Sequence, residues 1–187
     1  MDIKTKLSLN VITEEFERRI KALIEICESP IEEFFFINVF DYFYSQSLLS
    51  LRFDFLVRWV DEPTKLESFN YQERGINVYG YIYGIKVDIG EAVYSIIPQF
   101  EHKNYRLDFA IFIEKPNQKI KICIECDGHQ FHKTKEDNFK DSERTRNLFS
   151  DGWDTLRYTG SELFKWNSSD AESFEIMLIN NLKNLTI

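Results

Sequence analysis

The spacing of apolar residues predicts two helices at the start of the chain. Across residues 12–27 apolar positions recur every three or four residues, with charged residues in most gaps, which is typical of an amphipathic helix. A helix start signal follows: Ser29 can cap the helix, Pro30 suits its first position, and Glu32 can reach back to the Ser29 amide. We expect this second helix to extend to about Tyr44.

Alternation of apolar and polar residues predicts strands further along. The clearest pair, Tyr105–Ile113 and Lys119–Asp127, is joined by a turn at residues 114–118 and should form a hairpin. Further elements are expected at these positions: strands at 52–60, 78–88 and 153–158, helices at 134–150 and about 169–185, and a turn opening a short helix at 159–162. With no repeat or linker, this order predicts a single α/β domain with a central mixed β-sheet flanked by helices.

Three acids interrupt the apolar hairpin strands. Side chains alternate along a strand, so Leu107 and Phe109 are expected on one face and Asp108 on the other, while Glu125 and Asp127 share a face. Neighbouring strands lie about 4.8 Å apart, so the three carboxylates could converge. Such a cluster needs a cation, and oxygen ligands suit Mg²⁺ or Mn²⁺, which favours phosphodiester hydrolysis by metal-activated water. The alternative is strand-end acids paired with Lys or Arg.

Composition narrows the class of protein. The 187 residues are 43% hydrophobic and include 17 Phe, which excludes a disordered tail. The net charge of -8 argues against a protein that coats nucleic acid by charge alone. Three cysteines make no even disulfide framework, and neither a signal peptide nor a run of 18 apolar residues is present, so we expect a cytoplasmic protein that does not contact a membrane.

Two further motifs have competing interpretations. The spacing of Cys123, Cys126, His129 and His132 is similar to a zinc ligand set, but residues three apart on a strand face opposite sides, so buried cysteines are expected. The row Tyr79, Tyr81 and Tyr83 shares one strand face; such rings either pack across strands or stack on nucleobases.

Asp108 lies in a predicted strand, and the sequence ECDGHQFH follows from Glu125 to His132. This pattern resembles that of the PD-(D/E)XK nuclease superfamily, in particular its small branch related to very-short-patch-repair endonucleases. Residues 141–144 and 152–162 continue the pattern, and residues 29–32 and 98–99 also match it. The resemblance implies a restriction-endonuclease-like fold. Its parts are N-terminal helices at 1–44, a divergent or inserted region at 45–98, and a catalytic core at 99–187.

The resemblance also implies a set of metal ligands for Mg²⁺ or Mn²⁺. Asp108 and Glu125 would bind the ion directly, together with the backbone carbonyl of Cys126. A glutamate on the second helix would contribute through the water shell of the metal. Glu32 matches the motif, although capping would occupy it, and Glu33 is the alternative.

One departure from the superfamily concerns proton transfer. Asp127 stands where the superfamily usually has Lys, two residues after Glu125. His129 or His132 could then take the proton-transfer role, because an imidazole can accept or donate a proton at neutral pH. Lys121 and Lys133 are the alternative cationic groups.

The helix after the loop offers candidate DNA contacts. Asp141 and Arg144 are three apart and face together, which would orient Arg144 toward the site or a phosphate. Lys133, Lys140 and Arg144 are the candidate DNA-binding residues, although a helix laced with salt bridges is the alternative. The supporting residues are Gln99, Asp141 and Arg157, the last expected to anchor a carboxylate.

These features together predict an endonuclease that hydrolyses DNA phosphodiester bonds. The alternative is a catalytically inactive nuclease-fold module that binds DNA or a protein partner. The excess of acid predicts weak non-specific contact with DNA and leaves room for a protein partner that directs the enzyme to its target.

Overall fold

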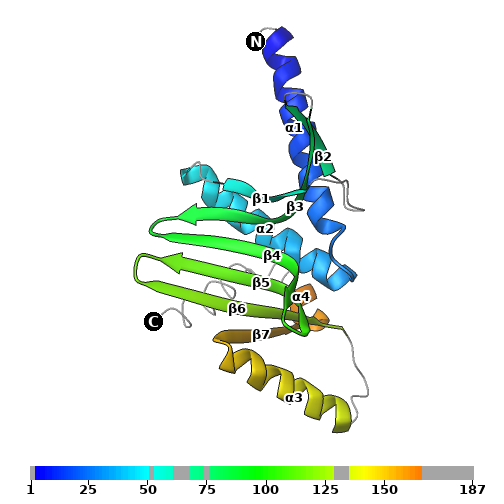
Figure 1. The fold of residues 1–187 in the computed structure, drawn as a ribbon, viewed down its shortest axis with the longest axis vertical. Helices are drawn as coiled ribbons and strands as arrows, with labels where there is room; N and C mark the ends of the chain where they lie inside the picture. The colour runs from blue at the N-terminus through cyan, green and yellow to red at the C-terminus, as the bar shows by residue number, and fades with distance from the viewer. Residues whose placement is uncertain (1–2, 51–52, 61–67, 74–75, 129–134, 166–187) are drawn as a thin grey trace.

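The computed structural model describes residues 3–50, 53–60, 68–73, 76–128 and 135–165 of the chain. This part of the chain contains four helices and seven strands, and Figure 1 shows how they are arranged. In order, the elements are α1 (Ile3–Ile24), α2 (Pro30–Ser50), β1 (Phe53–Val60), β2 (Ser68–Glu73), β3 (Ile76–Ile89), β4 (Ala92–His102), β5 (Tyr105–Lys115), β6 (Gln118–Asp127), α3 (Lys135–Ser150), β7 (Trp153–Thr159) and α4 (Gly160–Lys165).

The strands form one mixed sheet in the order β1-β3-β4-β5-β6-β7, and β2 pairs with β3. Every pairing is antiparallel except that of β6 with β7, which is parallel. In Figure 1, α2 runs across one face of the sheet, and α3 lies beside β7. The predicted α/β class, a central mixed sheet flanked by helices, is therefore confirmed.

Two apolar clusters hold the helices to opposite faces of the sheet. The larger one packs α1 and α2 on the sheet, with Phe35 and Phe36 of α2 against Phe109 of β5. The smaller one, on the other face, joins Leu148 of α3 to Trp153 of β7. Burial of both strand faces explains why the central strands are apolar in nearly continuous runs.

From Ile31 to Tyr44 most residues of helix α2 are buried or half-buried, and its first turn reaches the end of the hairpin where the acids lie. It contacts α1, α4, β3 and β6, which accounts for apolar residues on all its sides. No helix in the described part of the chain is long and apolar enough to cross a membrane.

The predicted elements agree with the structure best in the second half of the chain. The hairpin, α3, β7 and α4 are confirmed, and Gly152, which follows α3, has a φ of +79° that suits glycine. The first helix begins and ends earlier than predicted, and α2 runs on to Ser50. Residues 45–98 contribute the end of α2, three strands and the start of β4, of which only β1 and β3 were predicted. The expected helix at 169–185 lies outside the described residues.

Candidate active site

Strands β5 and β6 separate where the acids lie. Their register runs from Lys115 opposite Gln118 to Phe109 opposite Ile124 and stops there. One residue further, Asp108 Oδ2 accepts a hydrogen bond of 2.7 Å from the backbone N–H of Cys126. A side-chain carboxylate thus takes the place of a backbone acceptor, which fixes Asp108 in the opening between the strands.

The expectation that Leu107 and Phe109 share a face is wrong. Leu107 packs in the smaller cluster beside α3, whereas Phe109 packs in the larger cluster beneath α2. The physical reason is a break in strand alternation at Asp108. On the neighbouring strand β4, Pro98 pairs with Phe109 and Phe100 pairs with Leu107, so Gln99 lies across from Asp108. Gln99 has a φ of +49°, outside the β region.

Glu125 is buried on the α3 side of the sheet, with 6% of its surface exposed. Its Oε1 accepts hydrogen bonds from Arg144 Nη2 at 2.7 Å and from Cys123 Sγ at 3.0 Å. Arg144 Nη2 also donates to the carbonyl oxygen of Arg106 at 2.6 Å. Arg144 therefore reaches from α3 into the site and ties the helix to both hairpin strands.

The environment of both acids disfavours their charged forms. Burial raises the pKa of Glu125; the Cys123 hydrogen bond and the Arg144 charge oppose this rise, and the Asp108 charge adds to it. Burial also raises the pKa of Asp108, against the Cys126 N–H bond, and the charge of Glu32 adds to the rise. The hydrogen bonds and the Arg144 charge offset only part of the cost of burying these two carboxylates. A bound cation would stabilise their charged forms.

Glu32 and Ser29 form a capping box at the start of α2, but the predicted bond from the Ser29 amide to Glu32 is replaced by one from the Glu28 N–H. Glu32 Oε1 accepts a hydrogen bond from Ser29 Oγ at 2.8 Å, and the Glu32 N–H donates to Ser29 Oγ at 3.3 Å. Its Oε2 accepts from the backbone N–H of Glu28 at 2.9 Å and from Gln99 Nε2 at 2.6 Å. Glu32 is 6% exposed, whereas Glu33, the alternative, is exposed. Gln99 thus joins the sheet to the glutamate that faces the acids.

Arg157 lies between two carboxylates at the end of the sheet. Its Nη1 is 3.6 Å from Asp127 Oδ2 and 3.6 Å from Asp141 Oδ2. Asp127 follows Glu125 on the same strand face, so Arg157 supplies positive charge close to the position that the superfamily usually fills with Lys.

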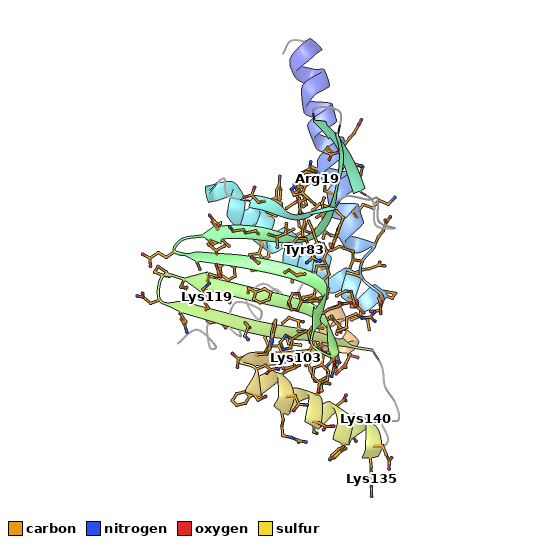
Figure 2. The ribbon with its side chains drawn as sticks, in the orientation of Figure 1. Arg19, Tyr83, Lys103, Lys119, Lys135 and Lys140 are labelled. Atoms are coloured by element: carbon orange, nitrogen blue, oxygen red, sulfur yellow. The ribbon has the colours of Figure 1, made fainter. Side chains whose placement is uncertain are left out.

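The structure does not bring Lys121 to the acids. Its Nζ donates to the backbone carbonyl of Asp151 and lies 5.3 Å from the centre of the Trp153 ring, four residues back along β6 from Glu125. Four residues of a strand span roughly 13 Å, so Lys121 cannot serve the site. Lys140 is exposed toward the start of α3 (Figure 2). His129, His132 and Lys133 lie outside the described residues.

The zinc interpretation fails on strand parity. Cys123 packs in the smaller apolar cluster, and Cys126 packs against the larger one on the opposite face. Two thiolates on opposite faces of a sheet cannot converge on one tetrahedral ion.

The donor set suits a hard divalent cation. Among the described residues, no group of three or more His, Cys, Asp and Glu side chains is arranged as a metal cluster. Asp108 and Glu125 each commit one oxygen to the hydrogen bonds given above, and within the described part of the chain the other oxygen of each has no such bond. Two carboxylate oxygens and a carbonyl are a typical protein contribution to Mg²⁺, which keeps several water ligands.

One unpredicted contributor is Cys123. The sequence offered a signal for it, because residues two apart on a strand share a face and Cys123 is two residues before Glu125. The expected burial of Cys123 is confirmed, but burial alone does not indicate which acceptor a thiol will bond to.

A mixed sheet between helices, with paired acids where two central strands separate, defines the restriction-endonuclease-like class of nuclease folds. The family model REase_MTES_1575 matches residues 84–177, which is half of the chain, and the chain belongs to this restriction-endonuclease-like family. The match includes Asp108 and Glu125 and contains the region of residues 99–162 on which the resemblance rests. No curated protein and no solved structure matches the chain.

Proposed function

We propose that the protein is a metal-dependent endonuclease that hydrolyses DNA phosphodiester bonds. The observation that carries the proposal is the position of the half-buried Asp108 and the buried Glu125, which Cys126 and Arg144 fix at the point where β5 and β6 separate. Membership in a restriction-endonuclease-like family supports a nuclease, and the acids supply a chemical means for it.

Asp108, Glu125 and the carbonyl of Cys126 would hold Mg²⁺ or Mn²⁺, with Glu32 contributing through water. When bound, such an ion lowers the pKa of a water molecule and offsets negative charge on the phosphate. We also propose that the protein belongs to the branch related to very-short-patch-repair endonucleases.

The residues of the chain have separate tasks in this scheme. Arg144 holds the Glu125 carboxylate in place by a charge-assisted hydrogen bond. Asp127, beside Arg157, orients the attacking water by accepting a hydrogen bond, and His132 or His129 takes up its proton. Lys133 and Lys140 contact the DNA backbone.

A cleavage assay tests the proposal. Purified protein is incubated with duplex, single-stranded and mismatched DNA in Mg²⁺, in Mn²⁺ and in EDTA, and we expect cleavage only with a divalent ion. Asp108→Asn and Glu125→Gln should each abolish cleavage. Glu114→Gln is the matched control, because Glu114 lies on the same strand as Asp108 but is exposed and paired with Lys119 at 2.8 Å.

Two results would overturn the proposal. One is folded protein that neither binds a divalent ion in calorimetry nor cleaves any of the DNA substrates, which is the behaviour of an inactive binding module. The other is full cleavage by Asp108→Asn or Glu125→Gln.

A further inference from the structure

A pocket of about 430 Å³ opens on the sheet next to the candidate active site. Its lining includes Arg58 of β1, Tyr81 and Tyr83 of β3, and Gln99 and Phe100 of β4, and the exposed Glu101 of β4 is its one acidic side chain. Gln99 also donates to Glu32, so one side chain borders both the pocket and the acidic site. Anything bound in the pocket would therefore lie close to the acids.

A bulge in the sheet presents two tyrosines on the pocket side. Leu56 of β1 is opposite Gly84, but Val57 is opposite Ile82, so Tyr83 is an extra residue on β3. Ile82 is buried in the apolar cluster beneath α1 and α2, whereas Tyr81 and Tyr83 are half-buried and line the pocket.

Arg58 completes this surface as a cation without an acidic partner among the described residues. Its guanidinium carbon lies 5.8 Å from the ring centre of Tyr81 and 5.4 Å from that of Tyr83, and its side chain is exposed. Other arginines do pair with acids: Arg18, Arg19, Arg106, Arg144 and Arg157. In a chain of net charge -8, an arginine held by rings and not by acids keeps its N–H donors available for an external anion.

We propose that the pocket binds one unpaired nucleotide of the nucleic-acid substrate, with its base against the tyrosine and Phe100 rings and its phosphate on Arg58. Paired bases in a duplex have their faces covered by neighbours, so ring surfaces in a pocket select an unstacked base. The inference rests on the proposed function, because it places this nucleotide next to the bond that the acids would cleave.

Fluorescence anisotropy with a labelled single-stranded oligonucleotide tests the pocket separately from catalysis, because EDTA in the buffer prevents metal-dependent cleavage. We expect the wild-type protein to bind the single strand more tightly than the same sequence as a duplex. Tyr83→Leu should weaken single-strand binding about tenfold, because it removes the ring. Tyr83→Phe should keep the affinity, since it retains the ring face and loses only the hydroxyl.

Arg58→Gln provides a second variant that keeps the side chain polar. It should weaken binding and reduce the salt dependence by about one phosphate contact. Lys119→Gln, next to the β5–β6 turn and apart from Tyr83 (Figure 2), removes the same charge away from the pocket and should change nothing. Circular dichroism and thermal melting of each variant establish that it is folded.

The inference is overturned if the wild-type protein binds no single strand, if it prefers the duplex, or if folded Tyr83→Leu and Arg58→Gln bind like wild type. Such results together with metal-dependent cleavage would leave the proposed function standing. Single-strand binding that depends on Tyr83 and Arg58, without cleavage in any metal, would instead support the pocket and reject the nuclease activity.

Discussion

At Asp108 a side-chain oxygen accepts the Cys126 N–H where a regular sheet would use a backbone carbonyl. Nearby, Glu125 depends on Arg144 for the charge that offsets its burial. Both arrangements hold an ionisable group in a place where its charge is costly, which is a common property of functional sites. Removing the charge of Asp108 should therefore stabilise the folded protein, whereas removing the Arg144 cation from Glu125 should destabilise it.

Asp108→Asn should stabilise the metal-free protein at neutral pH while abolishing cleavage. The pKa of Asp108 is raised in the folded state, so its stabilising contribution is present at low pH and is lost as the pH rises through the folded pKa. Asparagine keeps an oxygen for the Cys126 N–H and carries no charge. We expect a melting temperature a few degrees above wild type at pH 7 in EDTA.

The pH dependence provides the control for this variant. Below about pH 3 the carboxyl is protonated in both the folded and unfolded states, so the difference from wild type should vanish. A variant less stable than wild type at pH 7, or a difference that grows toward acid pH, would contradict the account.

Arg144→Met should destabilise the protein because it leaves Glu125 buried without its cation. Removing one partner of such a pair costs about 1–3 kcal/mol, measured as the free energy of unfolding in urea. Arg146→Met is the matched control, since Arg146 is exposed on the same helix, and it should change stability by less than about 0.5 kcal/mol. Equal losses in the two variants would show that the Glu125 contact contributes nothing.

At the scale of the elements, local signals were the predictable part. The hairpin, α3, β7, the cap of α2 and the short helix α4 follow from alternation, turn residues and cap residues that lie close together in sequence. Strand β2 and most of β4 were missed although each forms a hairpin with the next strand along the chain. Strand β2 is short and mostly polar, and Pro98 in the middle of β4 argues against a strand there. The break at Asp108 was also missed, because it depends on the conformation of Gln99 on a neighbouring strand.

The two capping boxes provide a prediction about α2 and α4. Thr159 and Glu162 form a box at α4, in which the Thr159 hydroxyl donates to Glu162 Oε2 at 2.8 Å, as the Ser29 hydroxyl donates to Glu32 Oε1 at α2. Ser29→Ala and Thr159→Ala should each cost about 1 kcal/mol in urea unfolding.

Of the two caps, only the one on α2 contains a glutamate of the candidate active site, Glu32, which accepts a hydrogen bond from Ser29. Ser29→Ala should therefore reduce the cleavage rate in Mg²⁺ beyond any loss of folded protein, whereas Thr159→Ala should leave the rate of the folded enzyme unchanged. If both variants cleave like wild type, the position of Glu32 has no influence on the reaction.

At the scale of the whole molecule, charge limits how the protein meets DNA. The net charge is -8, and most of the described arginines are occupied by acids of the chain itself. We expect few phosphate contacts, so the logarithm of the duplex affinity should fall with the logarithm of salt concentration with a slope no steeper than about -3. Anisotropy titrations from low to moderate KCl measure this slope, and a value near -6 or steeper would contradict the expectation.

The most direct test of the central claim is a crystal structure of the protein with Mn²⁺, located by its anomalous scattering. We predict an ion bound by the carboxylates of Asp108 and Glu125 and the carbonyl oxygen of Cys126, and no ion at this place in crystals of Glu125→Gln. An ion bound elsewhere, or no ion beside Asp108 and Glu125 in crystals that hold Mn²⁺ at millimolar concentration, would contradict it.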